Sequence, residues 1–250
     1  ISKTEFPTPD GFPFIPYHRE SRRIHGVTSL TINHLSKPYE QEHPLYKTGI
    51  AVGDYPVDHH HEAHPQAQEL PELHFYPVPS YNVPLGCLIP KETDHFLVTV
   101  KSISVSNLVN GTTRLQPVVL QLGQAAGITA ALARLNQIPP RAVSVRAVQN
   151  ELLSQGGYLF PYLDVPKAHP HFKVYQKIGA TGILRGMGKN VGWENQTWLY
   201  TDLPLNPNEV FLEEWDEFFA PKFPQNPTVS EVINWMEQAL TSPRTPEWLS

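Results

Sequence analysis

Residues 114–127 read Arg-Leu-Gln-Pro-Val-Val-Leu-Gln-Leu-Gly-Gln-Ala-Ala-Gly, and this stretch decides the fold that we expect of the chain. Apolar residues recur at helical spacing along it and beyond, which predicts a helix from about Gln116 to Asn136. The first amide groups of a helix lack partners and carry partial positive charge, so this N-terminus could face an anionic ligand. We expect Gly123, Ala126 and Gly127 to let the helix lie close to a sheet, because they are small.

Strand and helix patterns flank this helix on both sides. Runs of β-branched and other apolar residues predict strands at 24–32, 49–54, 82–90 and 95–100, and the most continuous, His95 to Val100, is the best candidate for a buried strand. A second amphipathic helix is predicted at 144–155, with Ser144 as its N-cap and Gly156-Gly157 at its end. Further helices are predicted at about 171–178, 207–219 and 228–240.

The composition excludes several classes of protein. A formal net charge of −5 over 250 residues argues against a protein that binds nucleic-acid backbones. The single cysteine, Cys87, excludes an intrachain disulfide framework and a multi-cysteine metal site, and we expect it to be a small buried hydrophobe. No apolar run approaches the roughly 20 residues that span a bilayer, so no transmembrane segment is expected.

Two polar clusters are candidates for function, and each has a simpler interpretation. The segment 58–64 reads Asp-His-His-His-Glu-Ala-His and could bind a metal only if the loop folds back on itself, so incidental surface histidines are the favoured interpretation. Arg19, Arg22 and Arg23 could bind a substrate carboxylate as an arginine fork, or could form an exposed salt-bridged face.

Five motifs in a fixed order resemble the C-terminal half of the bacterial FAD-dependent oxidoreductases often labelled xanthan-lyase-like. They are residues 17–26 (Tyr-His-Arg-Glu-Ser-Arg-Arg-Ile-His-Gly), 53–60 (Gly-Asp-Tyr-Pro-Val-Asp-His-His), 88–91 (Leu-Ile-Pro-Lys), 103–104 (Ile-Ser) and 123–127 (Gly-Gln-Ala-Ala-Gly). The resemblance implies FAD as cofactor and the C-terminal part of a glutathione-reductase-like fold. The expected fold class is therefore α/β, or α+β for an isolated fragment.

The resemblance also implies roles for individual residues. Arg114, Leu115 and Gln116 would approach the C2 carbonyl of the flavin, where negative charge accumulates on reduction. Asp58 and His60 match an Asp-x-His motif on the substrate side of the flavin, where a histidine could act as acid or base. One departure stands at Thr99-Val100-Lys101, since the family usually has Ala-Gly-Arg there and glycine permits close approach of the cofactor.

The N-terminal half of a flavin-binding fold has no counterpart in the sequence. That half carries the G-x-G-x-x-G turn that holds the pyrophosphate, and no such turn follows a strand here. The chain begins at Ile1 with neither an initiator Met nor a signal-peptide pattern, which suggests a processed chain or an excised fragment. We therefore expect the missing N-terminal FAD-binding segment to be a partner, and the isolated chain to be inactive.

A boundary near residue 158 is predicted, with the oxidoreductase portion at 1–158 and a helical accessory module at 159–250. The module resembles a weak S-layer-homology domain at residues 163–165 (Leu-Asp-Val), 178–186 and 205–209, although the usual Thr-Arg-Ala-Glu is here Asn-Pro-Asn-Glu. Its aromatic residues could form a sugar-stacking surface or belong to the core. These are Trp193, Trp198, Tyr200 and Trp215.

Two functions from different classes follow. The leading hypothesis is a fragment of a secreted or cell-associated FAD-dependent oxidoreductase that transfers a hydride from a small organic or carbohydrate-related substrate to flavin. The alternative is a non-catalytic module on a decayed flavoprotein scaffold that binds a polysaccharide or another partner. A metalloprotein built on the histidine loop is a weaker third interpretation.

Overall fold

The computed structural model describes residues 5–15, 17–20, 22–58, 80–182, 185–204 and 227–240. The chain mixes helices with two small antiparallel sheets, in agreement with the expected α/β or α+β class. The helices and strands follow one another as α1 (Ile32–Ser36), η1 (Leu45–Thr48), β1 (Gly49–Gly53), β2 (Tyr81–Pro84), η3 (Leu85–Cys87), α2 (Asn107–Thr113), α3 (Gln116–Asn136), η4 (Pro140–Ala142), α4 (Val145–Ser154), α5 (Phe172–Thr181), β3 (Met187–Val191), β4 (Glu194–Trp198) and α7 (Val229–Leu240).

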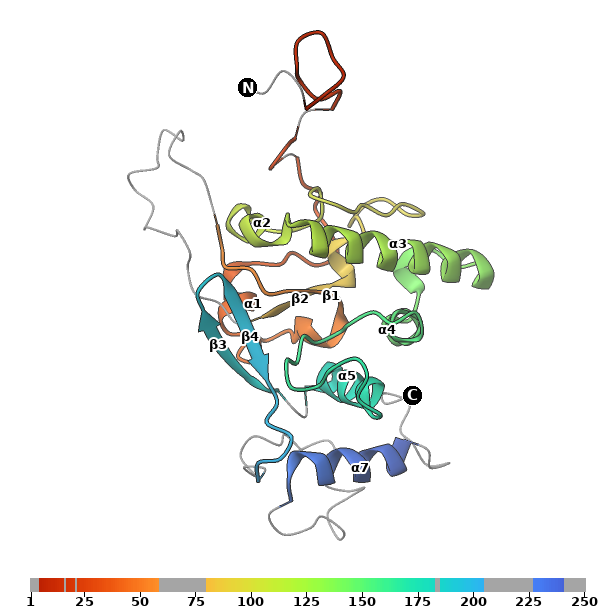
Figure 1. Cartoon of the computed structure of the whole chain (residues 1–250). Coiled ribbons are helices and arrows are strands. Elements are labelled where there is room, and N and C mark those ends of the chain that lie inside the picture. Colours follow the sequence, from red (N-terminus) through yellow and green to blue (C-terminus); the bar gives the residue numbers. More distant parts are fainter. Residues whose placement is uncertain are drawn as a thin grey trace.

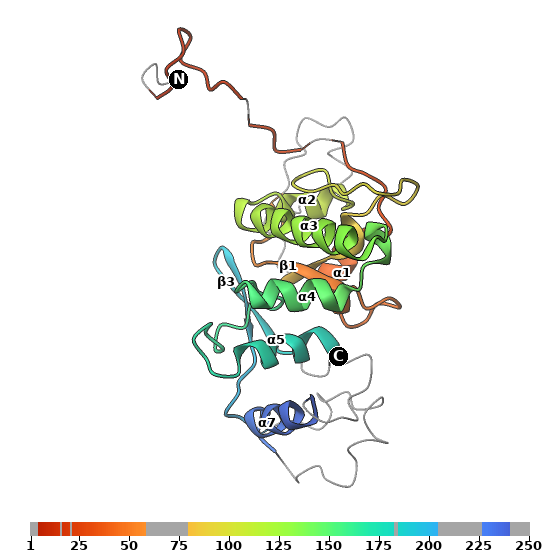
Figure 2. The same cartoon turned by 90° about the vertical axis from the view of Figure 1, so that its right-hand side faces the viewer.

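The elements are stacked in layers. Figures 1 and 2 agree that α2 and α3 form the top layer, that β1 and β2 lie beneath them, and that α4, α5 and α7 follow in turn. The β3–β4 hairpin stands beside this stack (Figure 1). One cluster of buried apolar side chains runs through the stack, from Leu30, two residues before α1, to Ile233 in α7. The division near residue 158 stays a prediction.

The helix predicted at 116–136 is α3, and it packs on strand β1. All five residues of β1 are buried, and the Gln121 side chain joins the helix to the strand. Its Oε1 accepts from the Val52 amide at 3.0 Å and its Nε2 donates to the Val52 carbonyl at 3.3 Å. The side-chain amide thus pairs with one residue of β1 as a neighbouring strand would, which satisfies backbone groups at a sheet edge.

The expected role of Gly123 and Gly127 is wrong. A Cβ built on either glycine meets nothing within 4 Å, so both lie on the open side of α3 rather than against the sheet. The inner face is made of Leu122, Ala125, Ala126 and Thr129, all of which are buried. The outer face is apolar as well, which is why α3 is long and apolar enough to cross a membrane by length and composition, although its inner face lies in the core.

The strand predicted at 95–100 is also wrong. This segment is irregular, Phe96 is 54% exposed, and Val98 makes a backbone bond to Leu88 outside any named strand. The strand predicted at 24–32 is wrong as well. Its described bridges are isolated, at Gly26 with Pro90 and at Leu30 with Val105, and Ile32 already belongs to helix α1. β1 is paired instead with β2, in an antiparallel register from Gly49 opposite Pro84 to Gly53 opposite Tyr81.

Several C-terminal expectations can be compared with the structure. The helices predicted at 144–155 and 171–178 are α4 and α5, and the Ser144 side chain accepts from the Ala147 amide as an N-cap. Gly156 ends α4 with a φ of 77°, a conformation that favours glycine. The helix predicted at 228–240 is α7, whereas the one predicted at 207–219 lies outside the described residues. The β3–β4 hairpin was not predicted.

Candidate functional site

The first turn of α3 is open to solvent and has no side-chain cap. Leu115 is the N-cap residue and supplies no hydrogen bond, while Gln116 and Pro117 are exposed. A proline in the first turn costs nothing there, because the amide that it lacks would have no partner inside the helix. The unpaired amides and the dipole of this 21-residue helix therefore present partial positive charge at an accessible position.

A buried ion pair lies directly before this turn. The Arg114 Nη2 atom donates to the Asp58 main-chain carbonyl at 3.0 Å and lies 3.4 Å from the Asp58 Oδ2 atom. The Arg114 side chain is 6% exposed and that of Asp58 is 17% exposed. Two residues that the sequence proposed for different roles, 56 positions apart, are thus brought together at the start of α3.

One polar atom of the Arg114 side chain makes no hydrogen bond within the described part of the chain. Among the described residues its Nη1 atom is buried and has no hydrogen-bond partner. A buried guanidinium nitrogen left unpaired is costly, so such an atom is commonly satisfied by a water molecule or another bound group. An acceptor such as a carbonyl or an anionic ring nitrogen would satisfy it.

Helix α2 is the platform that fixes Asp58. A Cβ on Gly111 would come within 2.6 Å of the Asp58 carbonyl oxygen, so only glycine allows α2 and the Asp58 backbone to approach this closely. The neighbouring Thr112 hydroxyl contacts the Tyr55 carbonyl at 2.6 Å and the Tyr81 hydroxyl at 2.8 Å. The sequence analysis missed these α2 residues, although a polar Asn-Gly-Thr-Thr run directly before Arg114 was the available signal.

The arginine cluster near the N-terminus reaches the same region through its backbone. Asn110 on α2 donates to the Arg19 carbonyl at 3.4 Å, and Asn107 donates to the Glu20 carboxylate at 2.9 Å. Arg19 and Arg22 are exposed, and Arg23 is partly buried with an Nη1 atom that has no partner among the described residues. The role of these arginines in substrate binding stays a prediction.

The histidine loop cannot be placed in this site. His60, the predicted acid or base, lies outside the described residues together with His59, His61 and His64. Asp58 is the last residue described before that loop. No cluster of three or more potential metal ligands occurs in the described part of the chain.

Val100 has a backbone conformation that favours glycine. Its φ is 66°, in the left-handed region that β-branched residues rarely adopt. The residue is 46% exposed, so it lies at a surface turn rather than in a packed strand. The valine that replaces the glycine of the resembled motif is therefore strained by its backbone.

Asp164, in the segment that resembles an S-layer-homology motif, stabilises the local fold of this chain. The Asp164 carboxylate accepts from the Leu199 amide at 2.9 Å and from the Tyr200 amide at 2.5 Å, and so fixes the exit from β4. Two of the tryptophans pair with tyrosines, since Trp193 stacks on Tyr55 and Trp198 on Tyr200, with ring centroids 6.0 Å apart in each pair. Trp215 lies outside the described residues, and a wall-binding role stays a prediction.

Comparison with known proteins identifies the family of the chain. The family model described as FAD dependent oxidoreductase matches residues 2–152, which include both Asp58 and α3. No curated protein and no solved structure matches the chain. Because the family model covers more than half of the sequence, the chain belongs to the FAD-dependent oxidoreductase family.

Proposed function

We propose that this chain forms the flavin-facing part of an FAD-dependent oxidoreductase, with the first turn of α3 directed at the pyrimidine edge of the isoalloxazine. The family implies FAD as the cofactor. The observation that carries the proposal is the exposed start of α3, which lacks a side-chain cap, beside a buried arginine whose Nη1 atom has no hydrogen-bond partner among the described residues. Both features favour electron-rich carbonyl and nitrogen atoms, which that edge of a flavin presents.

The residues present fit this edge of FAD but not its pyrophosphate. A pyrophosphate is normally held by a glycine-rich turn after a parallel strand, and the sequence contains no G-x-G-x-x-G motif. The sheets of the described part of the chain are antiparallel pairs. We therefore propose that a separate nucleotide-binding segment completes the site.

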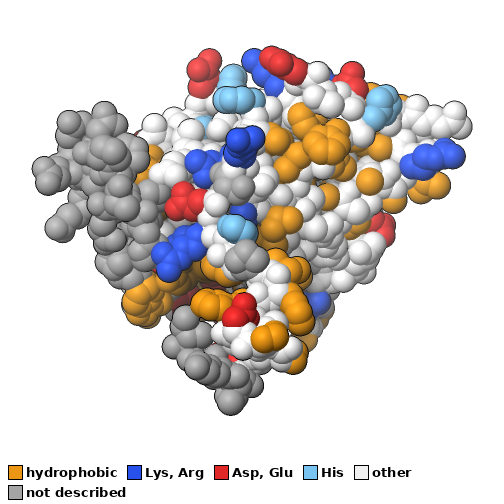
Figure 3. Space-filling view, turned by 90° about the horizontal axis from the view of Figure 1, so that it is seen from above, with side chains coloured by type: hydrophobic (Ala, Val, Ile, Leu, Met, Phe, Trp, Pro, Cys, Tyr) orange, Lys and Arg blue, Asp and Glu red, His pale blue; other side chains and the backbone are white. Residues whose placement is uncertain are grey.

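The outer face of α3 is our proposed docking surface for that segment. Leu120 and Leu135 are 73% and 77% exposed on it, and Gly123 and Gly127 leave open space between them. Figure 3 looks down on the side of the molecule that carries α2 and α3, and it shows hydrophobic side chains exposed among polar ones. Small residues on a helix allow another backbone to pack closely, and burying the leucines would stabilise the assembly.

The chain's own residues would then orient the cofactor and stabilise charge. When bound, FAD would supply the redox chemistry by accepting a hydride from a small organic or carbohydrate-related substrate. Arg114 and the amides of the first turn would stabilise the charge that develops at the pyrimidine edge. His60, two residues beyond Asp58 in the sequence, is the proposed acid or base, and Arg19, Arg22 and Arg23 are proposed to bind the substrate.

The absorbance of the purified chain between about 350 and 500 nm tests whether a separate nucleotide-binding segment is needed to hold FAD. Without a pyrophosphate-binding turn, the chain should retain no stoichiometric flavin after gel filtration with excess FAD, because binding one edge of the ring gives little affinity. A stoichiometric flavin spectrum would show that the chain holds the whole cofactor and would sink the need for a second segment.

A non-catalytic binding module is the second candidate, and the strained Val100 favours it. A scaffold released from cofactor binding can accept a valine where close approach of the cofactor is otherwise needed. Affinity electrophoresis against plant and bacterial polysaccharides tests this candidate. Retardation by one of them would support it, and migration unaffected by any would count against it.

A further inference from the structure

A second site lies away from the start of α3. A cavity of about 270 Å³ opens between the loop after α1, strand β2 and the β3–β4 hairpin. Its lining includes His34 from α1, Tyr39 from the loop after it and Tyr46 from η1. It also includes Asn82 from β2, Arg185 from the segment before β3, and Thr197 from β4. We propose that this cavity binds a single neutral sugar ring. The proposal does not depend on flavin binding by α3.

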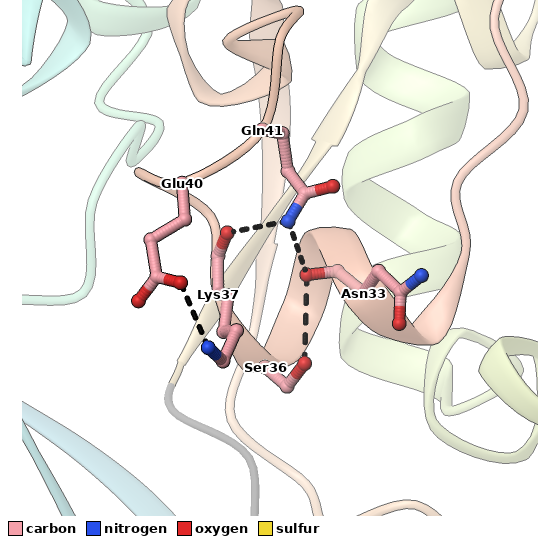
Figure 4. Close-up of polar contacts among 5 residues, drawn as sticks. All are labelled: Asn33, Ser36, Lys37, Glu40 and Gln41. Carbon is pink, nitrogen blue, oxygen red and sulfur yellow. Dashed lines mark hydrogen bonds and ion pairs between the residues drawn. The ribbon is translucent and has the colours of Figure 1, made fainter.

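The loop that forms one wall is held in place before any ligand arrives. Figure 4 shows the Gln41 side chain donating to the carbonyls of Asn33, at 3.3 Å, and Lys37, at 3.0 Å. The Lys37 ammonium in turn lies 2.8 Å from the Glu40 carboxylate across the turn. These contacts join the end of α1 to residues 37–41, so the loop loses little conformational entropy when a ligand binds.

The same loop presents aromatic surface to the cavity. The Tyr39 hydroxyl donates to the Arg185 carbonyl at 3.0 Å, and its ring meets that of Tyr46 edge to face with centroids 4.8 Å apart. Tyr81 and Phe160 add two further aromatic rings to the lining. Rings fixed in this way offer apolar faces against which the C–H groups of a pyranose can pack.

The charged side chains in the lining already contact other groups of the chain. Lys37 and Glu40 pair with each other, and the Arg185 guanidinium lies 4.6 Å from the Tyr39 ring centroid while its Nε donates to the Gly182 carbonyl at 3.3 Å. A charged ligand would lose its hydration on entering the cavity, and each charged side chain that it would meet there already has a partner, so its binding is unfavourable. The cavity therefore selects a neutral ligand.

The remaining polar groups suit a polyol. His34 lines the cavity, its Nδ1 accepts from the Thr31 amide at 3.1 Å, and burial lowers its pKa, so the ring stays neutral with a hydrogen on Nε2. Ser36, Ser80 and Asn82 donate to main-chain carbonyls of the chain, so their side-chain oxygens remain as acceptors toward the cavity. Thr197 adds a hydroxyl to the lining. Such a mixture of donors and acceptors matches the hydroxyls of a sugar, each of which both donates and accepts.

The size of the cavity limits the ligand to one ring. Its volume of about 270 Å³ lies just below the range of about 300–1,000 Å³ that is typical of small-molecule sites. The lining also joins residues inside the family match at 2–152 to residues beyond it, including Phe160, Arg185 and Thr197. The site therefore belongs to this chain as a whole rather than to the family segment alone.

Saturation-transfer NMR with the full chain tests the proposal. The probes are D-glucose, D-mannose, D-galactose and N-acetylglucosamine, each compared with the charged sugar D-glucuronate. At least one neutral sugar should bind with a Kd on the order of 1 mM, and D-glucuronate should bind at least about tenfold more weakly. No neutral sugar binding up to about 50 mM, or tighter binding of D-glucuronate, would overturn the proposal.

Two variants locate the binding, and a third is the matched control. Tyr39→Ala removes an aromatic wall and should weaken sugar binding at least about tenfold. Gly188→Leu adds a side chain to the lining from an exposed strand position opposite Thr197 and should abolish sugar binding. This variant keeps the test available if Tyr39→Ala fails to fold. Tyr17→Ala, at a 62% exposed tyrosine of the N-terminal arm, should change nothing. Sugar affinity that persists in Gly188→Leu would place binding elsewhere and refute the assignment.

Discussion

Replacing Val100 by glycine and by alanine tests the strain at this turn. Both changes remove the same half-exposed side chain, so the loss of packing nearly cancels between them. They differ in backbone preference at a φ of 66°. The left-handed conformation costs a residue with a Cβ about 1–2 kcal/mol, while glycine costs about 0.5–1 kcal/mol in chain entropy. Val100→Gly should therefore be more stable than Val100→Ala by about 0.5–1 kcal/mol.

Urea unfolding followed by circular dichroism measures this difference. Val27 is the matched control, since it is 54% exposed and lies outside the left-handed region. There the order should reverse, with Val27→Ala more stable than Val27→Gly by up to about 1 kcal/mol. If Val100→Ala were as stable as Val100→Gly, or if both positions gave the same order, the argument from backbone strain would be refuted.

Three further predictions concern the site and the core. Arg114→Met should lower the free energy of unfolding by about 3 kcal/mol, because it leaves the Asp58 carboxylate without its buried partner; a loss below about 1 kcal/mol in urea unfolding would contradict this. Gln121→Ala should lower the free energy of unfolding by about 1–3 kcal/mol, because it leaves both backbone groups of Val52 without their hydrogen-bond partner. Gln124→Ala, which loses only a hydrogen bond to the exposed Gln155, should cost less than about 0.5 kcal/mol. Equal losses would argue against a stabilising role for the Gln121–Val52 hydrogen bonds. Burial lowers the pKa of His34 below 6.5, so as the pH falls through 6.5 the unfolded chain takes up a proton that the folded chain does not, and stability falls; in His34→Gln this part of the decline between pH 6.5 and 5 should be lost, and an unchanged pH profile would contradict the burial argument.

The helices beside the site could be predicted from the sequence because local signals define them. Ser144 caps α4 through its side chain and Gly156 ends it, and the apolar spacing of residues 116–136 matches α3 closely. The orientation of α3 was harder to predict, because small apolar residues occur on both of its faces. Leucines also lie on both faces, with Leu122 buried and Leu120 and Leu135 exposed, so side-chain size did not distinguish the inner face from the outer one.

The strands were less predictable because their partners are distant or their residues are polar. His95 to Val100 has the composition of a strand, but it pairs with no strand in the described part of the chain, and both of its end residues lie in the left-handed region. Strand β3, Met187–Val191, is exposed throughout and carries no apolar alternation, so its pairing with β4 left no pattern to find. The Asp58–Arg114 pair joins residues 56 positions apart, and no local rule of sequence brings them together.

The most direct test of the central claim is amide NMR of the labelled full chain during titration with FMN and, separately, with AMP. FMN carries the isoalloxazine and AMP carries the adenine end of FAD. The account predicts that FMN shifts the amide signals of Leu115 and Gln116 and the guanidinium signal of Arg114, and that AMP leaves them unchanged. Shifts produced by AMP at these residues, or none produced there by FMN at about 10 mM, would contradict the assignment of the first turn of α3 to the flavin.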